Sequence, residues 1–156
     1  MPEPFVQRRD SQPATAPAPA PGLRLNVTSD PANLADVRRA CESFCMACGL
    51  DCCAAGEVGL CVNEAMANVT RHAYGGAHDR PVAVTGWFDG KAVHVSIRDR
   101  GNGVVPPSRD KYDPLTPGGL GLVCLRRMLD GVVYTPQPDG MLVTLTKFRK
   151  SRGCCG

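Results

Sequence analysis

Three polar side chains share one face of a segment that otherwise has an apolar helical pattern. Glu64, Asn68 and His72 lie four residues apart within residues 54–74. This spacing stacks side chains on the same face of an α-helix, so the carboxylate of Glu64 and the amide of Asn68 can reach one ligand. Taken alone, the stripe is better explained as a solvated helix face.

Two glycine-rich segments follow this helix in the chain. Residues 99–103, Asp-Arg-Gly-Asn-Gly, place an acid before two glycines that permit a backbone to approach a ligand closely. Residues 118–122, Gly-Gly-Leu-Gly-Leu, open a predicted helix whose free N–H groups and positive dipole end can hold a phosphate. An ordinary turn and plain packing would explain the two segments separately.

The elements that must position these residues follow from hydrophobic periodicity and turn signals. We expect strands at 23–27, 82–84, 93–97, 132–135 and 141–148, helices at 31–48, 54–74 and 120–129, and a long loop over 99–119. The pair Asp89-Gly90 marks a hairpin turn between two of the strands. This order predicts an α+β fold, a two-layer α/β sandwich with helices on one face of a mainly antiparallel mixed sheet.

The chain divides into a folded unit and two flanking segments. Residues 1–22 are rich in proline and alanine, with too little apolar surface to offset the entropy of ordering, so we expect a disordered arm. Residues 23–149 form the predicted domain, and residues 150–156 form a C-terminal tail.

Composition excludes several classes of protein. A length of 156 residues and an apolar content of 43% fit one domain with one core. A net charge of +3 without a long basic tract argues against a dedicated nucleic-acid binder. The chain contains neither an apolar run long enough to span a membrane nor the apolar region of a secretory signal. We therefore expect a cytoplasmic protein without membrane association.

Nine cysteines are the unusual feature of the composition, and six of them lie between residues 41 and 61. An odd number of cysteines without an export signal indicates reduced thiols. Cys41, Cys45 and Cys48 have the C-x3-C-x2-C spacing of an iron–sulfur site in radical enzymes that use S-adenosylmethionine. The same spacing places them on one helix face, where cysteine acts as a small buried hydrophobe, and this is the interpretation that we favour.

Together and in this order, the three motifs resemble the ATP-binding fold of the gyrase, Hsp90, histidine kinase and MutL (GHKL) superfamily, also called the Bergerat fold. The chain is most similar to the anti-sigma factor serine kinases of the RsbW and SpoIIAB type. The similar segments are residues 63–68, 72–74 and 119–122, followed by Arg126, residues 128–130 and Val133. The resemblance covers residues 23–149. A histidine kinase fits less well, because no dimerisation helix with a phosphoacceptor histidine precedes the domain.

The resemblance implies a role for each matching residue. Asn68 would bind Mg²⁺ through its amide oxygen, Glu64 would act as the general base, and Asp99 would accept a hydrogen bond from the adenine amino group. Gly101 and Gly103 would make room for the base and the ribose. Phosphate oxygens would lie against the second glycine segment, whose expected ligand-binding residues are Gly118, Gly119, Leu120 and Gly121.

The function implied is that of a protein serine/threonine kinase that uses ATP and Mg²⁺. Its expected substrate is a serine of an anti-sigma factor antagonist with a STAS-type domain; a sigma factor is a further expected partner, and a homodimer is the expected assembly. Two alternatives stay open: an ATP-binding regulatory module without kinase activity, and a metal or redox sensor that uses the cysteines.

The sequence departs from the family pattern at the last strand. Many members have a threonine after the glycine there, and its hydroxyl reaches the adenine, whereas here Gly140 is followed by Met141. Arg109 and Lys111, between the glycine segments, either contact phosphate or are solvated loop charges.

Overall fold

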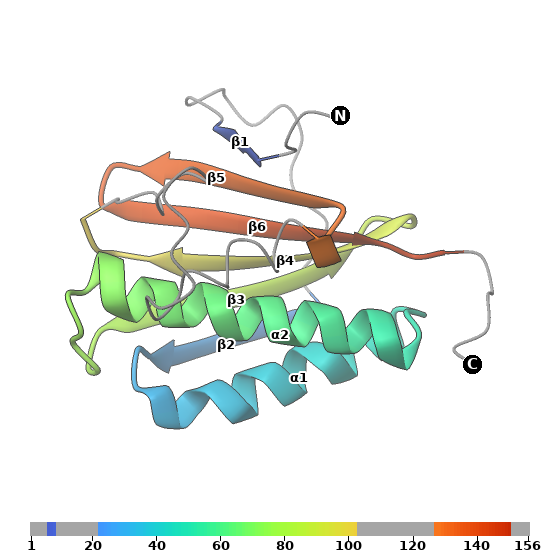
Figure 1. Cartoon of the computed structure of the whole chain (residues 1–156), viewed down its shortest axis with the longest axis horizontal. Helices are drawn as coiled ribbons and strands as arrows, with labels where there is room; N and C mark the ends of the chain where they lie inside the picture. The colour runs from blue at the N-terminus through green and yellow to red at the C-terminus, as the bar shows by residue number, and fades with distance from the viewer. Residues whose placement is uncertain (1–5, 9–21, 103–126, 151–156) are drawn as a thin grey trace.

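The computed structural model describes residues 6–8, 22–102 and 127–150 of the chain. Within these ranges, six strands form one sheet in the order β1-β5-β6-β4-β3-β2. The pairs from β5 to β2 are antiparallel, and β1 is parallel to β5. Figure 1 shows the long helices α1 and α2 side by side on one face of this sheet. The predicted α+β sandwich is therefore confirmed.

The first two of the three predicted helices are present, and an aspartate caps the start of each helical segment. Helix α1, Leu34–Ala47, follows a 3-10 turn, Pro31–Asn33, at which the Asp30 side chain accepts a hydrogen bond from the Ala32 N–H at 2.9 Å. Helix α2, Cys52–Asn68, begins two residues before the predicted position because Asp51 caps it by accepting from the Ala54 N–H at 2.7 Å.

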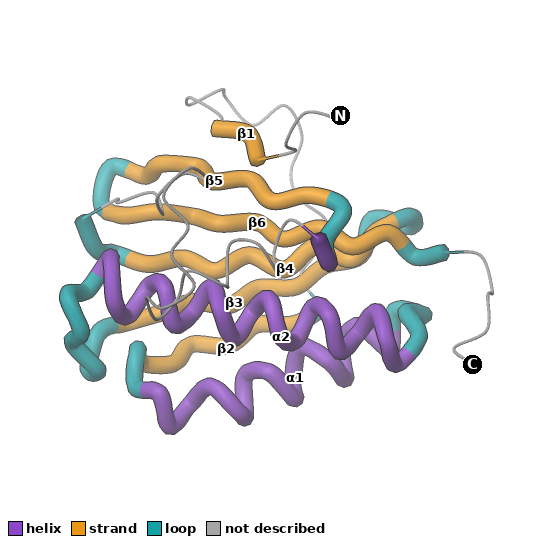
Figure 2. The backbone as a smooth tube through the Cα atoms, viewed as in Figure 1, coloured by secondary structure: helices purple, strands orange, loops and turns teal. Residues whose placement is uncertain are grey.

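The strands extend the predicted segments by a few residues at most of their ends. They are β2 (Leu23–Thr28), β3 (Pro81–Phe88), β4 (Ala92–Asp99), β5 (Gly131–Gln137) and β6 (Gly140–Phe148). The Asp89-Gly90 turn joins β3 to β4, and Gly90 has a φ of 94°, a conformation that glycine adopts without steric cost. Figure 2 shows these strands as one layer behind the two helices.

The core lies between the helices and the sheet. From the sheet it receives alternate side chains of the strands, including Val84, Val95, Ile97 and Leu145, which are at most 1% exposed. From the helices it receives Val37, Val58, Val62 and three cysteines, Cys41, Cys45 and Cys61. This packing fixes the position of α2 over β4 and β6, whose ends carry the candidate site.

The N-terminal arm differs from the prediction at one place. Val6–Arg8 form strand β1 within the segment expected to be disordered, and Gln7 is paired with Val133 of β5. The physical reason is that β5 would otherwise present an unpaired row of backbone N–H and C=O groups, which a short extended segment can satisfy without a hydrophobic core of its own. The remaining residues of the arm lie outside the described ranges.

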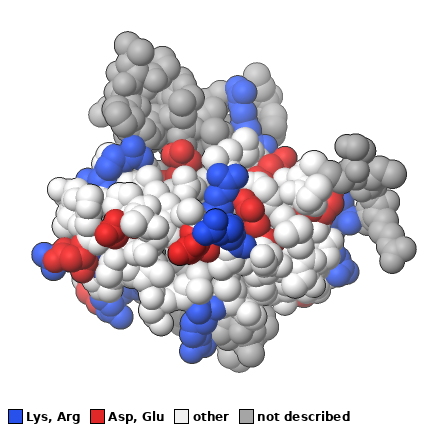
Figure 3. Space-filling view, turned by 90° about the horizontal axis from the view of Figure 1, so that it is seen from below, with Lys and Arg blue, Asp and Glu red and all other residues white. Residues whose placement is uncertain are grey.

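The predicted third helix, residues 120–129, also falls largely outside the described ranges. Of this segment the structure describes Arg127 and Met128, which are helical, and the buried Leu129. Among the described residues, no helix is both long enough and apolar enough to cross a membrane. Acidic and basic side chains are intermixed on the face of the molecule shown in Figure 3.

Candidate functional site

A cleft opens between the C-terminal half of α2 and the ends of β4, β5 and β6. Its lining consists of Ala65, Asn68, Val69, His72, Ala73, Asp99, Tyr134, Met141 and Val143. The fold thus brings two of the polar residues singled out on α2, Asn68 and His72, to the same cleft as Asp99 at the end of β4. The walls are otherwise apolar, with two polar side chains that are largely buried, as in many small-molecule sites.

Asn68 is the last residue of α2 and is only 7% exposed. Its side-chain oxygen accepts a hydrogen bond from Nη2 of Arg71 at 3.0 Å. Directly after Asn68 the helix changes to a π-helical turn, Val69–Ala73. Such turns are rare and occur often at functional sites. The turn places the residues after Asn68 along the wall of the cleft.

Glu64 lies one helical turn before Asn68 and is half-buried. It is absent from the cleft lining in the structure. No hydrogen bond or ion pair joins its carboxylate to another described residue. The carboxylate therefore stays available to a ligand or an attacking group that extends from the cleft along α2.

Arg71 is a residue of this region for which the sequence analysis gave no role. Besides its contact with Asn68, its Nε atom is buried and has no hydrogen-bond partner among the described residues. A buried donor without a partner is unusual in a folded protein. The signal in the sequence was the spacing: a residue three positions after Asn68 lies on the same helix face.

Asp99 ends β4 and is 4% exposed, with its side chain in the cleft. One carboxylate oxygen accepts a hydrogen bond from the Gly101 N–H at 2.9 Å. Burial raises the pKa of Asp99, while backbone hydrogen bonds from Gly101 and Met141 and the charge of Arg98 lower it by less. A buried carboxylate that is incompletely compensated in this way is typical of a ligand-binding acid.

Gly101 has a packing role that the sequence did not reveal. A Cβ atom built at this position would lie 2.4 Å from the carbonyl oxygen of Ala73, at the end of the π-helical turn. The next residue, Asn102, donates from its side chain to the carbonyl of His72 at 3.1 Å. The absence of a side chain at Gly101 therefore allows the end of β4 to pack directly against the end of the helix.

The other predicted glycine positions lie outside the described residues. These are Gly103 and the second glycine segment, Gly118, Gly119, Leu120 and Gly121, together with the loop residues Arg109 and Lys111. Their contacts with nucleotide stay predictions.

Met141 faces the cleft, as the departure from the family pattern suggested. It pairs with Asp99 across β6 and β4, and its side chain is 4% exposed. The position after Gly140 thus adjoins the candidate acid, but it carries a thioether instead of a hydroxyl donor. Among the described residues that line the cleft, Asp99 is the only acidic one.

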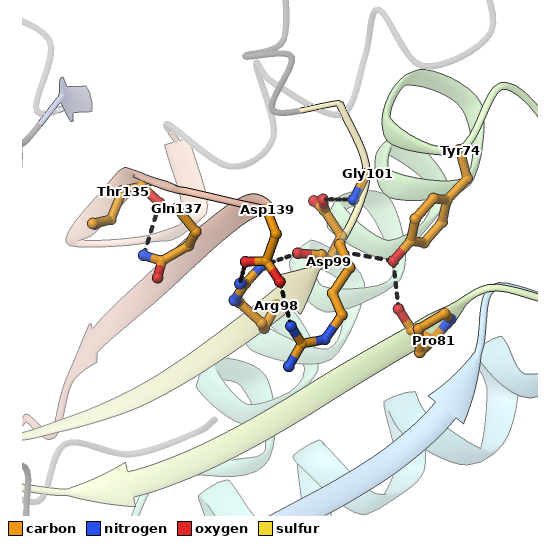
Figure 4. A network of polar contacts seen from close by, with 9 residues as sticks. Tyr74, Pro81, Arg98, Asp99, Gly101, Thr135, Gln137 and Asp139 are labelled. Atoms are coloured by element: carbon orange, nitrogen blue, oxygen red, sulfur yellow. Dashed lines mark hydrogen bonds and ion pairs between the residues drawn. The ribbon is translucent and has the colours of Figure 1, made fainter.

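A polar network outside the lining holds the end of β4 (Figure 4). The hydroxyl of Tyr74 accepts a hydrogen bond from the Arg100 N–H at 2.7 Å and donates one to the Pro81 carbonyl at 2.6 Å. On the other side, Arg98 and Arg100 both pair with Asp139 in the turn between β5 and β6. These partners are distant in the sequence and meet only through the fold, so no local pattern predicts their contact.

Two of the three cysteines expected on a buried helix face are placed as the favoured interpretation predicted, whereas Cys48, at the C-terminal cap of α1, is only half-buried. Cys41 and Cys45 are fully buried on the core face of α1, and burial raises the pKa of each thiol to about 12. Cys61 of α2 is buried with them, whereas Cys52 and Cys53 are exposed. In the described part of the chain, no three side chains of the metal-binding types lie close enough to hold a metal ion.

Comparison with known proteins agrees with this geometry. Residues 27–147 match the histidine kinase-like ATPase domain family. The chain is 29% identical to the anti-sigma F factor of Anoxybacillus flavithermus over 107 residues, which are 64% of this chain and 73% of that protein.

A solved structure shows the same fold. The structure of the RsbU and RsbW domains of Rv1364c from Mycobacterium tuberculosis superposes with a TM-score of 0.61 at 21% sequence identity. The match covers 88% of this chain and 35% of the other, so our chain spans about a third of that two-domain protein.

The family match covers most of the folded domain, and its description is that of an ATPase domain. It includes α2, the π-helical turn, the end of β4, and the residues of β5 and β6 that line the cleft. The chain therefore belongs to the histidine kinase-like ATPase domain family.

Proposed function

We propose that this protein is a serine/threonine kinase that binds ATP in the cleft and phosphorylates a serine of an anti-sigma factor antagonist. The observation that carries the proposal is the placement of Asp99, a buried carboxylate that lines the same largely apolar cleft as Asn68. The similarity to an anti-sigma F factor supports the choice of substrate class.

Asp99 would bind the base of the nucleotide. Its carboxylate is an acceptor for the adenine amino group, and the apolar side chains of Met141 and Val143 beside it can contact the ring faces. The Gly101 N–H already donates to one carboxylate oxygen and so holds the group in place.

The donor set on α2 fits Mg²⁺. The amide oxygen of Asn68, which lines the cleft, is a ligand of the kind that this cation prefers. Bound there with ATP, Mg²⁺ would offset the negative charge of the phosphates. In the structure Arg71 donates to the Asn68 oxygen, so this contact would have to be released before Asn68 could serve as a ligand.

Glu64 would act as the general base. It has no partner among the described residues, so its carboxylate is available to take the proton of a serine hydroxyl. The substrate would then approach along α2 from the open end of the cleft. A STAS-type antagonist as that substrate, a sigma factor as a second partner, a homodimer and a cytoplasmic location complete the proposal.

A single-turnover assay with labelled ATP and a purified antagonist domain tests the proposal, after a binding titration has fixed the ATP affinity of each protein. Glu64→Gln should bind ATP with nearly unchanged affinity and transfer phosphate ~10²-fold more slowly, which is the usual contribution of a positioned base. Glu42→Gln is the matched control, because Glu42 pairs with Arg38 on α1. Transfer by Glu64→Gln at the wild-type rate would remove the assignment of the base.

The regulatory module without kinase activity is the second candidate. It is favoured by Met141, which replaces the hydroxyl donor expected beside the base. Tight ATP binding by the wild-type protein with no transfer to any antagonist domain would establish this alternative.

The metal or redox sensor is the remaining hypothesis. Buried thiols with a raised pKa are poor metal ligands and poor nucleophiles, so Cys41 and Cys45 give this hypothesis no support.

A further inference from the structure

The turn between β5 and β6 packs directly against the end of β4, which carries Asp99. A role for this turn in nucleotide binding rests on the function proposed above. Asp139 of the turn accepts hydrogen bonds from two guanidinium groups, one on each of its carboxylate oxygens. The donors, Arg98 and Arg100, are the residues on either side of Asp99 in the chain, and Figure 4 shows Asp139 beside Arg98 and Asp99. One carboxylate therefore holds both neighbours of the candidate base-binding acid.

The backbone of the turn lies equally close to this strand end. Gly140 has a φ of 144°, and a Cβ atom built there would lie 2.1 Å from the carbonyl oxygen of Asp99. Arg98 also donates from Nη1 to that carbonyl oxygen. The turn thus touches Asp99 through the backbone and through its neighbours, while the carboxylate of Asp99 lies in the cleft.

An isolated exposed ion pair would contribute little to holding this geometry, because solvent screens it. Here the arrangement is a network of three charged groups, and the Arg98 side chain is only 19% exposed. The other side of the strand end is fixed by the hydrogen bond from Arg100 N–H to the Tyr74 hydroxyl. The end of β4 is consequently held from two directions.

We propose that Asp139 is a positioning residue for base recognition: by pairing with Arg98 and Arg100 it sets where the Asp99 carboxylate stands in the cleft. It does not touch the nucleotide. Substitution of Asp139 should therefore change how strongly the protein prefers one base over another. The contribution of the phosphates to nucleotide affinity should stay the same.

The test compares ATP with inosine triphosphate, which carries an oxygen where adenine has its amino group. In the wild type, ATP should bind more tightly, because only its amino group donates to Asp99. Asp139→Asn should weaken ATP binding about tenfold, within the range measured for coupled neighbours, and leave inosine triphosphate binding nearly unchanged. The preference for ATP would then largely disappear.

Asp89→Asn is the matched control. Asp89 and Asp139 both precede a glycine in a hairpin turn, but Asp89 lies at the opposite end of β4 and contacts His94 and the backbone of Lys91 and Ala92. This variant should keep the wild-type preference. An equal loss for both nucleotides in Asp139→Asn would mean that Asp139 is merely structural, and the proposal would be wrong.

A double-mutant cycle separates this inference from the proposed function. In the Asp99→Asn background, Asp139→Asn should have no further effect on ATP affinity, because the group that it positions is already lost. An additive effect would overturn the positioning role. If Asp139→Asn does not fold, Arg100→Gln removes one of the two contacts while keeping the turn, and it should reduce the preference for ATP in the same direction. A wild-type protein that binds neither nucleotide would refute the proposed function itself.

Discussion

Replacing Asp99 by asparagine should separate binding from stability. The substitution keeps the size of the side chain and an oxygen that can accept from the Gly101 N–H, but it removes the charge from a group that is 4% exposed. A hydrogen bond to a charged acceptor is worth about 1 to 3 kcal/mol. The affinity for ATP should therefore fall by roughly 5- to 150-fold at 25 °C.

The free energy of unfolding of Asp99→Asn should not fall together with its ATP affinity. Burial raises the pKa of Asp99 in the folded protein above its value in the unfolded chain, so the folded state binds a proton more readily. The stability of the wild type then decreases as pH rises from the unfolded pKa through the raised folded pKa, and the cost persists at neutral pH. Asp99→Asn lacks this charge and should be at least as stable as the wild type at pH 7.

The pH dependence of binding has the opposite sign. Only the ionised Asp99 accepts a hydrogen bond on both oxygens, so the ATP affinity of the wild type should rise as pH increases through the raised pKa of this group. In Asp99→Asn this rise should be absent.

The measurements are a titration with a fluorescent ATP analogue across pH and urea denaturation of both proteins at pH 7. Equal affinities in the two proteins would refute the assignment of Asp99 to the base. A large drop in the free energy of unfolding of Asp99→Asn would refute the reasoning on burial, and would make Asp99 a structural residue.

The packing leads to three further predictions. Gly101→Ala should reduce the free energy of unfolding by about 1 to 3 kcal/mol in urea denaturation, because its Cβ would meet the Ala73 carbonyl at 2.4 Å; an unchanged value would mean that the strand end moves freely. Lys147→Met should lower the free energy of unfolding by about 1 to 2 kcal/mol in the same assay, because the half-exposed Glu57 loses its partner at 2.6 Å. In the double variant with Glu57→Gln, part of this lost stability should return, because the unpaired charge is removed. In thiol labelling at pH 8, Cys52 and Cys53 should react quickly while the buried cysteines of α1 react only on unfolding, and equal rates for all would contradict their burial.

Much of the fold could be predicted from the sequence because local patterns dictate it. The apolar spacing along α1 and α2 and the Asp89-Gly90 turn are properties of short segments, and the structure contains both helices and the turn. The buried face formed by Cys41 and Cys45 followed from the same helical spacing. For the site, the four-residue spacing placed Asn68 and His72 on one face of the helix, and both line the cleft.

The arrangement around Asp99 was decided only by the tertiary structure. Asp139 lies 40 residues from Asp99 in the chain, and no local pattern indicates that its turn packs against the end of β4. Likewise, Lys147 occupies a position of β6 that faces the helices, and only the approach of Glu57 and the Met128 carbonyl explains a buried charge there. The short strand β1 escaped prediction for the same reason, since its pairing depends on the free edge of β5. Periodicity identifies which face of a segment is buried, but the register and stacking of the sheet determine which distant side chains meet, and those contacts decide the surroundings and the pKa of the carboxylate in the cleft.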